Sequence, residues 1–198
     1  MKRFKQKWFV GDTVSVGIVQ GYNLATPLQL AVATATLANQ GAQMQPYLVR
    51  QIQNAKSGAV APIAPQTVST LPIKPENLAL VPNAMIDVPR PGGTANRAAA
   101  GAPYAIAGKT GTAQVVAIKQ GEKYVESRIA ERHRDHALFI AYAPADNPTI
   151  ALAILVENGG LGGSTAAPIA RAMFDYYLLG KLPARAATPT EEEEAEHD

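Results

Sequence analysis

The sequence predicts an α+β fold in which an antiparallel sheet is flanked by helices. Three strand candidates follow one another in the second half of the chain, at Tyr104–Val116, His136–Ala143 and Pro148–Glu157. Short or charged connections join them, and helical patterns lie before and after them, an order that favours α+β over a doubly wound parallel sheet. The 198 residues, 47% of them hydrophobic, suffice to build a core.

The clearest helix start lies at Thr26, which can cap a helix over Pro27–Asn39. The proline suits the first helical position, and Gln29, three residues after Thr26, completes a capping box. Apolar residues then recur at helical spacing until Gly41, a natural stop. We therefore expect an amphipathic helix in this segment.

Further helices are expected later in the chain. Pro75–Asp87 carries apolar residues at helical spacing and is followed by a proline- and glycine-rich stretch that ends it. The last helix is expected to begin after a cap at Thr165 and to end at Gly180. Residues 94–100 could add one short helical turn, and some helix is expected around Val125–Arg132.

A turn connects the second and third strand candidates. Residues 144–147 combine a proline with Asp and Asn, which favour turns through their own backbone geometry, so the two strands should form an antiparallel hairpin. Shorter strand candidates lie at Val14–Ile18 and Tyr47–Ile52. Residues 1–182 should form the folded domain, and 183–198 a disordered acidic tail.

Composition and charge exclude several classes of function. Cysteine is absent, which rules out disulfide scaffolds, thiolate zinc sites and cysteine nucleophiles. The formal net charge is +2, and the body is nearly neutral because basic residues cluster at the start and acidic ones from Lys181 onward, so no large basic face for nucleic acid is expected. No run of about 18 apolar residues is present, so we expect no membrane span. Gly11 and Asp12 interrupt the start before an apolar targeting region develops.

Two glycine-containing segments match nucleotide-binding loops only in part. The Gly-Lys-Thr triplet at 108–110 would need a glycine at the position of Pro103, and a strand precedes it where a loop is required. In residues 158–164 two glycines match a dinucleotide fingerprint, but Thr165 takes the place of the third. We interpret 158–164 as a flexible loop with tight turns.

A dense cluster of Glu131, His133, Asp135 and His136 could hint at a metal site. Three arginines are interleaved with these residues, and their charge disfavours a bound cation. We therefore favour a solvated ion-pair segment and expect neither a metal nor a cofactor.

The strand segment Lys109-Thr110-Gly111-Thr112 has residue types suited to acyl transfer. A strand edge can offer a backbone N–H to a developing oxyanion, while a lysine and threonine hydroxyls suit a substrate carboxylate. Gly111 would remove a side chain where substrate must lie against the backbone. By themselves these four residues also fit an ordinary edge strand with an exposed lysine.

Four stretches of the sequence carry a family resemblance, in the order Gln20–Gln29, Pro91–Ala95, Ala107–Gln114 and Glu157–Gly160. The third stretch contains Lys-Thr-Gly, the third motif of penicillin-binding proteins and serine β-lactamases. Together the stretches resemble the class B penicillin-binding proteins, and residues 129–136 resemble the elongation type, penicillin-binding protein 2. The resemblance covers about residues 3–182.

This resemblance implies a partial domain of the β-lactamase/transpeptidase fold. It further implies a peptidoglycan D,D-transpeptidase, which binds penicillin and cross-links stem peptides through a serine acyl-enzyme. Lys109 would help hold the charge and proton network of the site, and the hydroxyls of Thr110 and Thr112, beside Gly111, would bind the terminal carboxylate. The Thr112 N–H would form half of the oxyanion hole.

The resemblance also implies partners and a location. The expected partners are D-Ala-D-Ala stem peptides, β-lactams and the cell-elongation machinery. The expected location is the inner membrane, with the catalytic domain in the periplasm.

The sequence departs from the family because it contains neither Ser-x-x-Lys nor Ser-x-Asn. Its serines are Ser15, Ser57, Ser69, Ser127 and Ser164. We therefore expect that Met1 is an internal start, that the chain alone is inactive, and that an apolar surface is exposed. Three alternatives stay open: part of a D,D-carboxypeptidase, part of a serine β-lactamase, or a non-catalytic interaction module.

Overall fold

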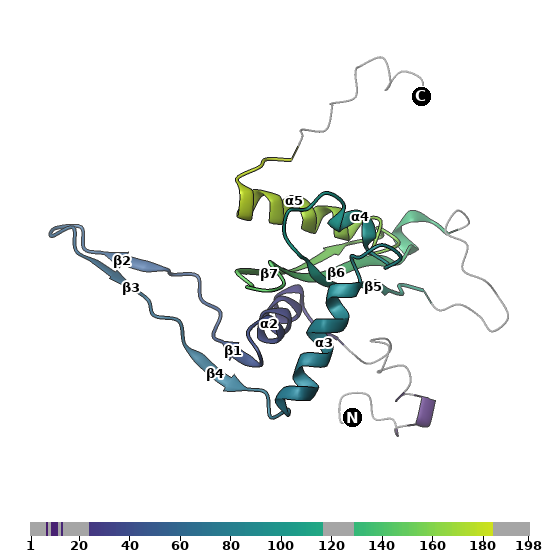
Figure 1. Ribbon diagram of the computed structural model, residues 1–198, viewed down its shortest axis with the longest axis horizontal. Helices are drawn as coiled ribbons and strands as arrows, with labels where there is room; N and C mark the ends of the chain where they lie inside the picture. The colour runs from purple at the N-terminus through teal and green to yellow at the C-terminus, as the bar shows by residue number, and fades with distance from the viewer. Residues whose placement is uncertain (1–6, 8, 12, 14–23, 117–128, 184–198) are drawn as a thin grey trace, which may run out of the picture.

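The computed structural model describes residues 7, 9–11, 13, 24–116 and 129–183. Its elements are, in chain order, α2 (Pro27–Ala38), β1 (Ala42–Met44), β2 (Gln51–Gln53), β3 (Val60–Pro62), β4 (Thr67–Thr70), α3 (Pro75–Asp87), α4 (Asn96–Ala99), β5 (Ala107–Ala113), the 3-10 helix η2 (Glu131–His133), β6 (His136–Ala143), β7 (Ile150–Val156) and α5 (Ala166–Leu179). Figure 1 shows helices on both faces of one sheet, with a long two-stranded arm that leaves from the end of α2 and returns to the start of α3.

The sheet has the strand order β5–β6–β7, and both pairings are antiparallel. This confirms the predicted α+β class and the predicted hairpin between the last two strands. Register pairs Lys109 with Ile140 and Thr112 with Ala137, so β5 runs along β6 for its whole length. Because β5 lies at the end of this order, no strand among the described residues pairs with its other backbone edge.

Helices cover the two faces of the sheet unequally. On one face, α5 packs against a core that includes Phe139 and Phe174, both fully buried. On the other face, α2 and α3 pack near Tyr142 and Met85 (Figure 1). The alternation of side chains along β6 therefore places one set of residues toward α5 and the other toward α2 and α3.

The helix boundaries follow the local signals closely, with one exception. In α2, the Thr26 hydroxyl accepts from the Gln29 N–H and the Gln29 side chain accepts from the Thr26 N–H, which confirms the capping box. The expected side-chain cap at Thr165 is wrong: Thr165 has φ −107° and ψ −55°, in the helical rather than the extended region, and its side chain accepts no capping hydrogen bond. Its hydroxyl donates to the Gly159 carbonyl at 2.8 Å. Gly180 ends α5 in the left-handed conformation, as predicted.

Residues 42–70 form the arm, which consists of two short antiparallel pairs, β1–β4 and β2–β3. Every residue of β2, β3 and β4 is exposed. The strand expected over Tyr47–Ile52 is wrong at its start, because pairing begins at Gln51. A two-stranded ribbon of this kind has no covered face of its own.

Several predictions fall on residues that the structure does not describe. These are the strand at Val14–Ile18, the first half of the helix around Val125–Arg132, and the acidic tail apart from residue 183. In the described half of that helix, only the start of the 3-10 helix Glu131–His133 is helical. Within the described residues, no helix combines the length and hydropathy that a membrane crossing requires.

Candidate functional site

The segment Lys109–Thr112 lies in the middle of β5, on the strand that forms one end of the sheet. Lys109 and Thr112 are exposed, and Thr110 and Gly111 are partly buried. Because side chains alternate along a strand, the two threonines face the α5 side and the lysine faces the α2 and α3 side. The four predicted residues therefore border one accessible strand edge from both of its faces.

The Lys109 side chain folds back along its own strand. Its Nζ donates a hydrogen bond to the Thr110 carbonyl at 2.7 Å. The ammonium thus stays near the backbone of the next residue, where it can add positive charge beside a ligand lying along β5.

Glycines allow β5 to lie close to its neighbours. A Cβ at Gly108 would come within 2.5 Å of the Phe139 ring, and one at Gly111 within 3.2 Å of the Leu138 Cβ. Gly108 therefore supports packing of the strand over a buried aromatic ring. Gly111 was predicted to make room for substrate, and its tight contact with Leu138 gives it a packing role as well.

A hydroxyl pair joins β5 to the segment before α4. The Oγ1 atoms of Thr94 and Thr110 are 3.0 Å apart, and either can be the donor. Sequence reasoning did not assign a role to Thr94, although it lies in the Pro91–Ala95 stretch that contributes to the family resemblance. Nothing in the local pattern indicates that a residue sixteen positions earlier contacts the strand.

The glycine-rich loop between β7 and α5 packs closely against the same strand. A Cβ at Gly162 would lie 2.1 Å from the Leu138 carbonyl oxygen and 2.6 Å from that of Gly111. A Cβ at Gly163 would lie 2.1 Å from the carbonyl oxygen of Thr94. The loop was interpreted as flexible, but two of its glycines, Gly162 and Gly163, lie where a Cβ would clash with backbone carbonyls of β5, β6 and Thr94.

The start of β6 anchors the other end of this loop. The Gly160 N–H donates to the Asp135 carbonyl at 2.8 Å, and the Asn158 N–H donates to the His136 Nδ1 at 2.9 Å. Two members of the polar cluster weighed as a metal site therefore make structural contacts. Among the described residues, no group of three or more His, Cys, Asp or Glu side chains is placed to hold a metal ion.

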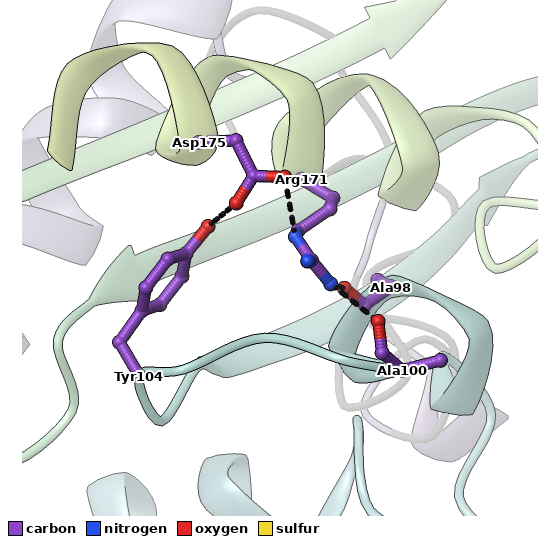
Figure 2. A network of polar contacts seen from close by, with 5 residues as sticks. All are labelled: Ala98, Ala100, Tyr104, Arg171 and Asp175. Atoms are coloured by element: carbon purple, nitrogen blue, oxygen red, sulfur yellow. Dashed lines mark hydrogen bonds and ion pairs between the residues drawn. The ribbon is translucent and has the colours of Figure 1, made fainter. Parts of the chain in front are cut away.

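A polar network holds the connector between α4 and β5 against α5 (Figure 2). The Tyr104 hydroxyl donates to the Asp175 carboxylate at 2.5 Å, and the Arg171 Nε donates to the same carboxylate at 2.9 Å. The Arg171 Nη1 donates to the carbonyls of Ala98 and Ala100, at 3.0 and 2.7 Å. Arg171 and Asp175 lie four positions apart within α5, a spacing that favours an ion pair, but the links to Tyr104, Ala98 and Ala100 span more than 70 positions and are not indicated by any sequence pattern.

The network shifts the protonation of its acidic groups. Burial raises the pKa of the Tyr104 phenol, and the adjacent Asp175 carboxylate raises it further. Burial also raises the pKa of Asp175, but hydrogen bonds from Tyr104 and Arg171 outweigh that effect and hold it below its ordinary value. At neutral pH the phenol is therefore a stable donor to an ionised carboxylate.

The sequence of the chain is similar to that of known proteins. Residues 3–175 match the penicillin binding protein transpeptidase domain family. The chain is 46% identical, over 179 residues, to a peptidoglycan D,D-transpeptidase MrdA of Acinetobacter baumannii, with 90% of this chain and 26% of that protein covered. The chain thus spans about a quarter of the length of that relative.

Solved structures give the same picture. The chain matches Pseudomonas aeruginosa PBP2 in complex with WCK 5153 at a TM-score of 0.70 and 39% identity, covering 96% of this chain and 38% of that one. It matches PBP2 in the complex between PBP2 and MreC from Helicobacter pylori at a TM-score of 0.66 and 30% identity, covering 91% and 30%.

Proposed function

Since the chain belongs to the penicillin-binding protein transpeptidase domain family, we propose that it forms the C-terminal portion of a peptidoglycan D,D-transpeptidase that cross-links stem peptides. The observation that carries the proposal is the accessible edge of β5, where Lys109 and Thr112 are exposed. An extended peptide can lie along such an edge by backbone hydrogen bonding. The hydroxyls and the lysine there suit its terminal carboxylate.

The reaction proceeds through a serine acyl-enzyme. A serine hydroxyl attacks the carbonyl between the two D-Ala residues, loses its proton to a base, and releases D-Ala as an amine that takes up a proton. An amine from a second stem peptide then attacks the ester carbonyl and forms the cross-linking amide. The ester C–O bond breaks, the amine gives up a proton, and the serine oxygen takes a proton back. In this proposal the nucleophile comes from outside these 198 residues, because they contain no Ser-x-x-Lys.

Each residue of the β5 segment has a defined part in this proposal. Lys109 supplies positive charge and connects to the proton network of the serine. Thr110 and Thr112 donate their hydroxyls to the terminal carboxylate beside Gly111, and the Thr112 N–H donates to the oxyanion that forms during attack. The exposure of Thr112 supports this role, since a threonine in a packed core could not meet a ligand.

Partners and location follow from the same family. β-Lactams acylate the serine in place of the stem peptide. The Helicobacter pylori relative was solved with MreC, which supports a partner in the elongation machinery for this protein too. The protein is anchored in the inner membrane and its catalytic domain lies in the periplasm.

Fluorescent penicillin labelling tests the proposal. In a chimera, this chain replaces the matching 26% of the Acinetobacter baumannii relative, so that the serine is supplied by the rest of that protein. We expect covalent labelling of the chimera, loss of labelling when its nucleophilic serine becomes alanine, and no labelling of this chain alone. A folded chimera that is not labelled would overturn the proposal.

Variants of the chimera test the site residues. Thr112→Val should slow labelling by at least about tenfold, because it removes a hydrogen bond to a charged group. Thr67→Val, on exposed β4 in the arm, is the matched control and should label at the rate of the parent chimera. Equal rates for both variants would remove Thr112 from the site.

A further inference from the structure

We propose that Thr94 is a positioning residue that orients the Thr110 hydroxyl toward the terminal carboxylate of the substrate. The inference rests on the proposed transpeptidase function and adds a residue outside the β5 segment. Its basis is the 3.0 Å contact between the Oγ1 atoms of Thr94 and Thr110. The pair is accessible at the surface of the described structure, so Thr110 keeps room for a second partner.

The direction of the hydrogen bond follows from the number of protons. A threonine hydroxyl carries one proton and accepts through its lone pairs. If Thr110 donates its proton to a carboxylate, it can only accept from Thr94, so Thr94 must donate. A bound carboxylate therefore fixes the direction of both hydrogen bonds: Thr94 donates to Thr110, and Thr110 donates to the carboxylate. Each hydrogen bond in such a chain strengthens the next.

Thr94 is itself held firmly enough to perform this task. On its N-terminal side, a turn closes through the bond from the Ala95 N–H to the Val88 carbonyl at 3.0 Å. On its C-terminal side, α4 is fixed because Arg171 donates to the carbonyls of Ala98 and Ala100 (Figure 2). The Thr94 hydroxyl is therefore presented from a backbone that is fixed on both sides.

The glycine-rich loop between β7 and α5 packs against the pair formed by Thr94 and Thr110. A Cβ at Gly163 would lie 2.1 Å from the Thr94 carbonyl oxygen and 3.5 Å from the Thr110 Cγ2. The loop backbone therefore lies against both threonines at once. Thr110 has few staggered side-chain rotamers, and the contact with Thr94 favours the one that directs its oxygen toward Thr94 and its proton outward.

Preorganisation of a donor is worth most where negative charge is bound. Thr94 should therefore affect ligands that carry a carboxylate and have little effect on ligands that lack one. A purely structural role would affect both kinds of ligand equally. This difference separates positioning from simple support of the fold.

The test measures the acylation rate of the chimera by penicillin and by its methyl ester, which lacks the negative charge. We expect Thr94→Val to slow acylation by penicillin about tenfold, the cost of a lost hydrogen bond in a charged chain, and to leave the ester within about twofold of the parent. Thr94→Ser retains the donor and should restore most of the rate with penicillin.

Two further variants complete the test. Thr149→Val removes a hydroxyl that contacts only the Ala143 carbonyl among the described residues, in the turn between β6 and β7, and should leave both rates unchanged. In a chimera that already carries Thr110→Val, Thr94→Val should cause no further loss with penicillin, because the chain of hydroxyls is already broken.

The outcomes are distinguishable. A parent chimera that is not acylated at all contradicts the proposed function. Two outcomes with an acylated parent contradict the positioning role alone. In the first, the Thr94→Val chimera is acylated by penicillin as fast as the Thr149→Val chimera. In the second, Thr94→Val slows acylation by penicillin and by its methyl ester to the same extent.

Discussion

The central sheet and the arm are both antiparallel, yet they differ in what covers them. In the sheet, Phe139 and Ala141 of β6 are fully buried beneath α5. In the arm, Leu48 is 102% exposed and Ile52 is 59% exposed. Hydrogen-bond pairing is thus common to both regions, while burial of apolar surface distinguishes them.

This difference indicates which region of the described structure contributes most to the free energy of unfolding. Burial of apolar side chains is the dominant favourable contribution to folding, and a paired strand without a covered face gains little of it. The strand that carries Lys109 and Thr112 belongs to the covered sheet, so the candidate site is built on the part of the molecule that packs on the buried core. In the arm, β1 is half-buried beside α2, whereas β2 and β3 expose apolar side chains and bury little of them.

The largest expected effect comes from the core beneath α5. Phe139→Ala should lower the free energy of unfolding by roughly 3–5 kcal/mol, because it leaves a cavity where a fully buried ring packed. Tyr47→Ala, a similar truncation in the arm, should cost less than about 1 kcal/mol. Urea unfolding of the two variants measures the difference, and similar losses would contradict the comparison.

The next largest loss of stability is expected at Gly162, in the loop between β7 and α5. Gly162→Ala should cost about 1–3 kcal/mol, because the new Cβ would press against the carbonyls of Leu138 and Gly111. Gly58→Ala in the arm meets no described atom within 4 Å, and its φ of +72° alone should cost about 1 kcal/mol. Thermal unfolding compares them, and an equal or larger loss at Gly58 would show that the loop is not tightly packed.

The Tyr104 network predicts a pH dependence. Burial and Asp175 raise the pKa of Tyr104 above its ordinary value of 10, so unfolding favours loss of the phenolic proton. The contribution of Tyr104 to the free energy of unfolding is therefore fully present below pH 10 and is lost as the pH rises through the folded-state pKa. Tyr104→Phe should cost about 1 kcal/mol at neutral pH and should reduce the alkaline fall.

Urea unfolding between about pH 9 and about pH 11 measures this dependence. A residual fall is expected in Tyr104→Phe, because burial also raises the pKa of Tyr142. Tyr176→Phe, at an exposed position of α5, should retain the full alkaline fall. The same alkaline slope in both variants would show that the Tyr104 network does not contribute.

The smallest effect is expected in the arm. Leu48→Ser should change the free energy of unfolding by less than about 0.5 kcal/mol, because the side chain is fully exposed. It should also reduce the binding of a hydrophobic dye, since it removes exposed apolar surface. A loss of stability as large as that of Phe139→Ala would contradict the exposure of Leu48 and show that its side chain is buried in solution.

Local signals predicted the elements whose residues determine their own conformation. The capping box gave the start of α2 at Pro27, and a proline followed by apolar spacing gave α3 with its observed bounds. The apolar run at His136–Ala143 gave β6 to the residue. In these segments, the chemistry that fixes the backbone lies within a few positions along the chain.

Contacts between distant segments were not predictable from the sequence. Thr165 was expected to cap α5, but the folded loop holds it in a helical rather than an extended conformation and brings the Gly159 carbonyl within reach of its hydroxyl. The closeness of Gly162 to β5 and the contact of Thr94 with Thr110 also depend on tertiary packing. Periodicity indicates which face of an element is buried, and it does not indicate which neighbour covers that face.

The central claim is that the β5 edge forms the wall of an acyl-transfer cleft. A crystal structure of the penicillin-acylated chimera tests it most directly. We predict that the penicillin carboxylate lies within hydrogen-bond distance of the Thr110 and Thr112 hydroxyls, with Lys109 beside it. A carboxylate bound elsewhere, with these three side chains free of the ligand, would contradict the account.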